Sequence, residues 1–130
     1  MNACSEDIKD MLVAESALAL EFGTTLFIGR EPAEPSNVVT IFDTIGANPE
    51  LTLDALSFER PSIQIRVRNS SYTSGWEFIQ SITNALHGRA QETWNGTLYS
   101  IIYVSSGPAM LNWDQNNRVH IIVNFNIQRR

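Results

Sequence analysis

The sequence predicts a single compact α+β domain, residues 1–130, in which a mainly antiparallel β-sheet packs against two helices. Apolar and polar residues alternate along residues 62–68 and 118–128, which is the period of a strand with one buried face. Apolar residues recur at helical spacing over residues 5–20 and 72–87. A chain of 130 residues is also a usual length for one domain with one core.

The first helix is expected over residues 5–20. Ser5 is a good N-cap, and Glu6 and Asp7 follow it where the helix dipole favours negative charge. The apolar positions behind them keep a helical period: Ile8, Met11, Leu12 and Leu18. A turn then leads to a short predicted strand at residues 25–29.

Two prolines interrupt the chain after this strand. Pro32 and Pro35 cannot donate a hydrogen bond to a sheet, so residues 31–36 are predicted to form a loop. Residues 37–42 are rich in β-branched residues and are predicted to form the next strand.

A second loop is predicted at residues 43–50, because this segment carries Gly, Asn and Pro, which favour turns. Residues 51–56 leave strand and loop both open, because leucines alternate at two positions but Asp54 interrupts the pattern.

The strand at residues 62–68 has one apolar and one cationic face. Its apolar side chains are Ile63, Ile65 and Val67. Arg66 and Arg68 protrude together from the other face, where they could reach a phosphate or a partner's carboxylate. The alternative is that both arginines lie over neighbouring apolar surface.

The second helix is expected over residues 72–87, with either Ser71 or Ser74 as its N-cap. Its apolar stripe should lie on the sheet. The residues of this stripe predicted to be in the core are Trp76, Ile79 and Leu86.

The last third of the chain predicts a hairpin and a long final strand. Asn95 and Gly96 indicate a type I′ turn between residues 92–94 and 97–104. Residues 105–117 are rich in Ser, Gly, Pro and Asn and are predicted to form a long exposed connection. Its apolar residues, which either contact a partner or fold back on the core, are Met110, Leu111 and Trp113.

Charge is unevenly distributed along the chain. Residues 1–60 carry eleven acidic and three basic residues (−8), and residues 61–130 carry three acidic and six basic residues (+3), which together give the net −5. Such a split indicates either a solvated surface or complementary faces on successive copies of the chain. The overall acidity argues against a dedicated nucleic-acid binder.

The sequence contains few residues that suggest catalysis. Cys4, near an N-terminus expected to fray, forms no recognisable metal spacing with His87 and His120, and no cofactor is expected. Asp43, Asp54 and Glu59 could converge as carboxylates, but acidic residues in loops are usually only solvated.

No apolar run approaches the ~20 residues of a membrane helix, and the acidic start is unlike a signal peptide. A soluble protein made in the cytoplasm, with no membrane partner, is expected.

Five segments together resemble the small tail terminator, or tail completion, proteins of long-tailed phages. They are LFIGREPAEPSNVVTIFDT, ERPSIQIRVR, NALHG, WNGT and VNFNIQR, and the similarity runs over about residues 26–130. One departure is at Asn116 and Asn117, where a glycine turn is expected.

This resemblance implies a structural virion protein rather than an enzyme: a ring, expected to be hexameric, that caps the tail tube, ends its polymerisation and forms part of the head-tail junction. It implies three protein partners, namely further copies of the chain, the major tail tube protein and a head completion or connector protein. Phage DNA passes through the lumen without being read. The alternatives are another neck component, such as a head completion or connector protein, and a small hydrolase. The residues expected to make contacts are Arg66, Arg68, Asp43, Asp54, Met110 and Trp113.

Overall fold

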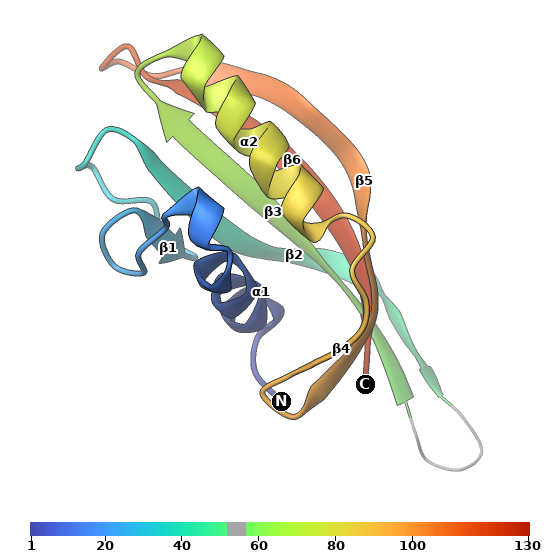
Figure 1. The fold of residues 1–130 in the computed structure, drawn as a ribbon. Coiled ribbons are helices and arrows are strands. Elements are labelled where there is room, and N and C mark those ends of the chain that lie inside the picture. Colours follow the sequence, from blue (N-terminus) through green and yellow to red (C-terminus); the bar gives the residue numbers. More distant parts are fainter. Residues whose placement is uncertain (52–56) are drawn as a thin grey trace.

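The computed structural model describes the backbone of residues 1–51 and 57–130, and the side chains of residues 1–47 and 58–130. In these residues one sheet has the strand order β1-β2-β3-β6-β5-β4, and two α-helices lie on one of its faces (Figure 1). The elements are α1 (Cys4–Ala14), the 3-10 helix η1 (Ser16–Leu18), β1 (Leu26–Ile28), β2 (Val38–Leu51), β3 (Ser57–Asn69), α2 (Tyr72–Leu86), β4 (Ala90–Trp94), β5 (Thr97–Trp113) and β6 (Val119–Arg129).

The central strands β3 and β6 contribute the buried side chains of the sheet to the core. Among the described strands β1 pairs in parallel with β2, and the other neighbours are antiparallel, which confirms the predicted α+β class. On β3 the buried side chains are Ile63, Ile65 and Val67. Beside them on β6 are Val119, Ile121, Val123, Phe125 and Ile127. α1 and α2 cover this apolar face because each helix must bury its own apolar stripe.

The second helix lies where its periodicity predicts. Of the two predicted caps, Ser71 is the one used, and its Oγ accepts a hydrogen bond from a backbone N–H in the first turn. Ile79 and Leu86 are buried, as predicted. Trp76 is only half-buried, because it lies at the margin of the core with its ring 6.3 Å from that of the exposed Tyr72.

The first helix is shorter than the periodicity suggested. α1 ends at Ala14, and the chain leaves η1 at Ala19 with a left-handed φ of 51°. Cys4 was expected in a fraying terminus, but it begins α1 and is only 3% exposed.

Strand β2 continues through residues 43–50, so the predicted loop there was wrong. Two β-bulges take up the turn-forming residues while pairing with β3 continues. Gly46 makes this possible, because a Cβ atom at this position would lie 2.1 Å from the carbonyl oxygen of Arg60. Residues 52–56, part of the undecided segment, lie outside the described residues.

Strand β5 likewise continues through residues 105–113. The prediction of a long exposed connection at residues 105–117 was therefore wrong. The hairpin before it is confirmed, since Asn95 and Gly96 have φ values of 50° and 79°, as a type I′ turn requires. β5 reaches Trp113 through several bulges, and only a short turn at residues 114–118 leads to β6.

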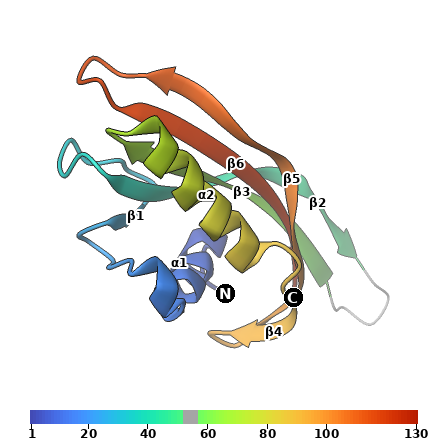
Figure 2. The same cartoon turned by 45° about the horizontal axis from the view of Figure 1, so that its top comes forward.

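The two ends of the sheet differ. At the end opposite the turn between β5 and β6, β2 and β3 extend past both helices (Figures 1 and 2). This two-stranded extension, called the arm below, comprises the described residues 44–51 and 57–61.

Candidate assembly surfaces

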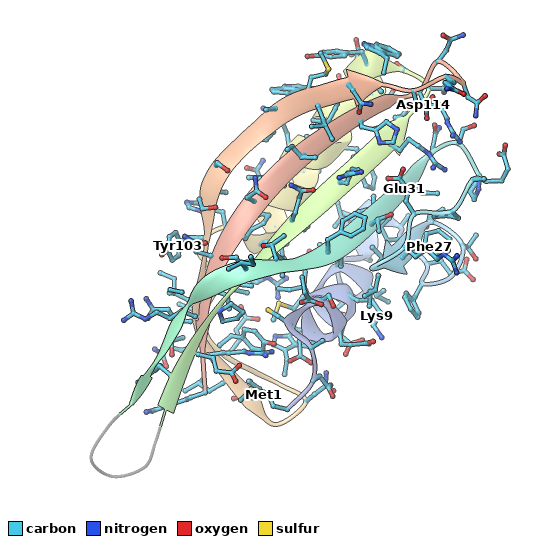
Figure 3. The ribbon with its side chains drawn as sticks, turned by 180° about the vertical axis from the view of Figure 1, so that it is seen from behind. Met1, Lys9, Phe27, Glu31, Tyr103 and Asp114 are labelled. Carbon is cyan, nitrogen blue, oxygen red and sulfur yellow. The ribbon has the colours of Figure 1, made fainter. Side chains whose placement is uncertain are left out.

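The face of the sheet opposite the helices carries a row of hydrogen-bonded polar side chains (Figure 3). Arg66 Nη2 donates to Gln64 Oε1 at 3.3 Å, both on β3. Gln64 Nε2 donates to Asn124 Oδ1 on β6 at 3.2 Å, and Asn124 Nδ2 donates to Ser106 Oγ on β5 at 2.9 Å. We call these four residues the amide ladder, and the face that carries them the uncovered face. Strand alternation places Gln64, Arg66 and Asn124 there, because their neighbours in sequence are buried under the helices.

A hollow of about 250 Å³ lies beside the amide ladder, at the base of the arm. Ile45, Arg60 and Tyr103 line it. At its wall Ser62 Oγ donates to Asn126 Oδ1 at 2.8 Å. The uncovered face therefore offers polar groups on both a flat and a recessed surface.

The structure places the two predicted contact arginines in different environments. Arg66 remains half-buried on the uncovered face, with its guanidinium 5.1 Å from the centre of the Phe42 ring. Arg68 was predicted to protrude, but it is only 2% exposed. The loop before β2 covers it, so Arg68 belongs to the fold and not to an exposed contact surface.

Arg68 holds that loop by its guanidinium. It donates to the carbonyl oxygens of Pro35 at 2.6 Å and Ser36 at 3.1 Å, and its Nη1 lies 3.3 Å from Glu31 Oε1. Further carbonyls of the same loop, those of Pro32 and Ala33, also accept from it. One buried cation thereby satisfies backbone oxygens that the two prolines leave without sheet partners.

A histidine lies between two carboxylates beside this arginine. His120 Nε2 is 3.2 Å from Asp114 Oδ2, and His120 Nδ1 is 3.5 Å from Glu31 Oε1. Arg118 joins the group through Asp114 at 2.9 Å and through the Ala33 carbonyl at 2.6 Å. Figure 3 shows Glu31 and Asp114 at the same end of the uncovered face.

The environment of Asp114 favours its charged form. Burial by itself would raise its pKa. Hydrogen bonds from Arg118, His120 and the backbone of Asn116 outweigh burial and lower the pKa of Asp114 well below its usual range. The cluster therefore fastens the proline loop to the turn between β5 and β6.

The predicted acidic contact residues have different outcomes. Asp43 accepts from the backbone N–H of Ser5 at 3.0 Å and from Ser5 Oγ at 2.6 Å. It therefore caps α1 from a distant strand, a role that a sequence pattern does not reveal. Asp54 lies outside the described residues.

The predicted apolar contact residues lie on an exposed patch near the start of α2. Met110 is 46% and Trp113 49% exposed. The Trp113 ring is 6.4 Å from the ring of Tyr72, which is itself exposed. Leu111 is exposed beside them. We call Tyr72, Met110, Leu111 and Trp113 the apolar patch; the side chains do not fold back into the core. An exposed group of large apolar residues is typical of a contact surface.

The most exposed large apolar residue among the described side chains lies on the arm. Ile45 is 98% exposed, although isoleucine is normally among the most buried residue types. The arm and the apolar patch lie at opposite ends of the sheet (Figure 1).

The charge split of the sequence is largely neutralised within the chain. Glu15 Oε1 lies 2.6 Å from Arg89 Nη2, and Glu59 Oε2 lies 3.0 Å from Arg129 Nη2. Together with the pair made by Arg68, these contacts join acids of the first half to bases of the second. Most of the basic charge expected to attract a neighbouring copy is therefore already paired.

A buried polar cluster joins the N-terminal helix to the C-terminal strand. The Asp7 carboxylate is fully buried and accepts from the hydroxyl of Tyr99 and from Asn95 Nδ2 at 2.7 Å. Burial raises the pKa of the Cys4 thiol to about 12, and burial and the bond to Asp7 raise the pKa of Tyr99. Arg129 donates to the Tyr99 hydroxyl at 3.2 Å. These groups hold their protons firmly, as befits a structural cluster.

Within the part of the chain that the structure describes, no group of three or more His, Cys, Asp or Glu side chains is arranged to hold a metal ion. None of the described helices has both the length and the apolar character needed to span a membrane.

Comparison with family models identifies the chain. Residues 12–130 match the model described as bacteriophage tail terminator protein. The chain belongs to this family. It is therefore a structural protein of the phage tail, associated with the virion.

A solved structure shares the fold of this tail terminator family member. The match is to a chain in the virion of native gene transfer agent (GTA) particle, with a TM-score of 0.70 and 12% sequence identity. It covers 98% of this chain and 94% of that chain. A search of curated proteins gave no match.

Sequence reasoning missed the amide ladder and the histidine cluster. Alternation makes Gln64 and Asn124 polar positions of their own strands, but the pairing register that brings them together was not predicted. For His120, alternation with the apolar positions of β6 was the one signal that it shares a face with Arg68.

Proposed function

We propose that this phage tail protein caps the tail tube, ends its polymerisation and forms part of the head-tail junction. The family match over residues 12–130 carries the proposal. Six copies form a ring on the end of the tube, and phage DNA passes through the lumen. The ring contacts the major tail tube protein on one side and a head completion or connector protein on the other.

The apolar patch and the exposed Ile45 on the arm support assembly into a ring. A contact that joins the arm of one copy to the apolar patch of the next is heterologous, because the two surfaces differ. Such contacts leave one free arm and one free patch at the ends of every open chain, and they are all satisfied when the ring closes. Met110 and Trp113 are accordingly the proposed contact residues between copies. Salt bridges contribute less, since the charged groups are largely paired within each chain.

Immunogold electron microscopy of isolated tails and isolated heads tests this assignment. The proposal expects the label at one end of each isolated tail and none on heads that lack tails. Label on tailless heads would instead identify a head completion or connector protein, and label along the whole tube would identify a tube subunit.

A further inference from the structure

We propose that the uncovered face of the sheet lines the channel of the ring and contacts the phosphate backbone of duplex DNA. The contacts come from Arg66, the amide ladder and Asn126. This inference rests on the proposed function, because it needs a ring with a channel.

The described side chains of this face carry little negative charge, although the chain as a whole is acidic. The net charge of the chain is −5, yet β5 and β6 contain no Asp or Glu. The acidic residue of β3, Glu59, pairs with Arg129, whose guanidinium also bonds to Tyr99 on the helix side of the sheet. Strand alternation places Arg66 on the uncovered face, where its guanidinium donates to the neutral Gln64. An arginine among neutral hydrogen-bond donors is complementary to phosphate.

Two acidic residues at one end of this face are neutralised. Glu31 and Asp114 lie at one end of it, and each is paired with an arginine. The carboxylates of Glu31 and Asp114 therefore offer little repulsion to a phosphate that approaches the amide ladder.

The polar side chains of the face have the donors that phosphate oxygens need. Each amide carries two N–H donors, and the ladder uses one from Gln64 and one from Asn124. The hydroxyl of Ser106 ends the ladder as an acceptor, so its own proton can be donated outward. Internal bonds hold these side chains in position, which lowers the entropy lost on binding.

The chemistry of the face also limits its affinity. Neutral amides bind phosphate more weakly than lysine or arginine, and sequence would be read only by contacts to base edges. A single contact arginine per copy, Arg66, gives weak binding that salt readily screens. A surface of this kind orients DNA without holding it, as a channel for a moving genome requires.

Side-chain amide signals in ¹⁵N NMR spectra test this inference directly. The ¹⁵N-labelled protein is titrated at low salt with a DNA duplex of mixed sequence. A duplex of about 20 base pairs is used, because it spans roughly two helical turns. The amide signals of Gln64, Asn124 and Asn126 are expected to shift, and the shifts should be lost at about 0.5 M salt. The signals of Gln80 and Asn84, exposed on α2, should not move.

A matched pair of variants separates this face from general repulsion. N124D/N126D adds two negative charges to the uncovered face and keeps both oxygens as acceptors for Gln64 and Ser62. Q80E/N84D adds the same charge on α2. Only the first is expected to weaken duplex binding, by about tenfold at ~50 mM salt. Urea unfolding verifies that both variants are folded.

Three results would overturn the inference: no amide shift with DNA, equal DNA binding by the two double variants, or the same amide shifts on adding tail tube protein in place of DNA. The last result would make the uncovered face a protein contact. The proposed function fails separately, if the protein binds DNA on this face but does not limit the length of tail tubes.

Discussion

Replacing Arg68 by alanine tests whether this arginine belongs to the fold. The sequence pattern assigns Arg66 and Arg68 the same contact role, whereas the structure buries Arg68 and leaves Arg66 half-buried. Arg68 is buried and holds the proline loop through carbonyl oxygens and the Glu31 carboxylate. Arg66 is half-buried and makes one 3.3 Å bond to a neutral acceptor. R66A is therefore the matched control for R68A.

The contacts set the expected size of each effect. Removing one partner of a buried charged pair typically costs about 3–5 kcal/mol of unfolding free energy. The loop carbonyls can return to water when the loop opens, since Ala33 and Pro35 are already exposed. We therefore expect R68A to cost about 3 kcal/mol, at the lower end of that range. R66A loses one hydrogen bond and a ring contact, and should cost about 1 kcal/mol or less.

Urea unfolding followed by tryptophan fluorescence measures both values on the same protein. The unfolding midpoint should fall clearly for R68A and little for R66A, with equal slopes if both unfold in two states. Equal losses for the two variants, or a loss below about 1 kcal/mol for R68A, would refute the assignment of Arg68 to the fold.

Further predictions concern the core, the acid limb of stability, the buried thiol and the apolar patch. Ile79→Ala should destabilise by about 2–5 kcal/mol in urea unfolding, since Ile79 is fully buried on the apolar stripe of α2; a loss under about 1 kcal/mol would place the helix elsewhere. The pKa of Asp114 is lowered on folding, so its contribution to stability is present above its ordinary pKa of about 4 and is lost as the pH falls below that value. Urea midpoints measured from pH 7 to 2 should therefore fall less steeply for D114N, and parallel curves would contradict this. Cys4 should react with a thiol reagent at pH 8 only on unfolding, because its thiol is 3% exposed and its pKa is about 12; rapid labelling of the folded protein would be the contrary result. M110S/W113S should keep the fold and lose ring assembly in sedimentation experiments, whereas rings as stable as those of the unchanged protein would remove the apolar patch from the contact.

Hydrophobic periodicity predicted most elements of the fold, and its failures have a common physical cause. Residues 43–50 and 105–117 contain glycine and proline, which favour turns over a few residues. In the structure β-bulges accommodate them within longer strands. The pairing partners that keep those strands extended come from distant parts of the chain, so a local pattern does not contain them.

For the candidate contact residues, the sequence pattern predicted at most which face of a strand carries the side chain, and not how buried it is or what it binds. Alternation correctly put Arg66 and Arg68 on one face of β3, but only the folded position of the proline loop distinguishes a buried arginine from a half-buried one. Asp43 looked like a loop carboxylate because its partner, Ser5, lies 38 residues away. For Met110 and Trp113 the sequence left both contact with a partner and packing back on the core open, and the structure shows them exposed.

The length of tail tubes polymerised in the presence of this protein tests the proposed capping activity most directly. Purified tail tube protein is allowed to polymerise alone and with increasing amounts of the terminator family protein, and tube lengths are measured by electron microscopy. Capping predicts tubes that become shorter and stop growing, with the added protein bound at one end. Tubes of unchanged length at saturating protein would contradict it.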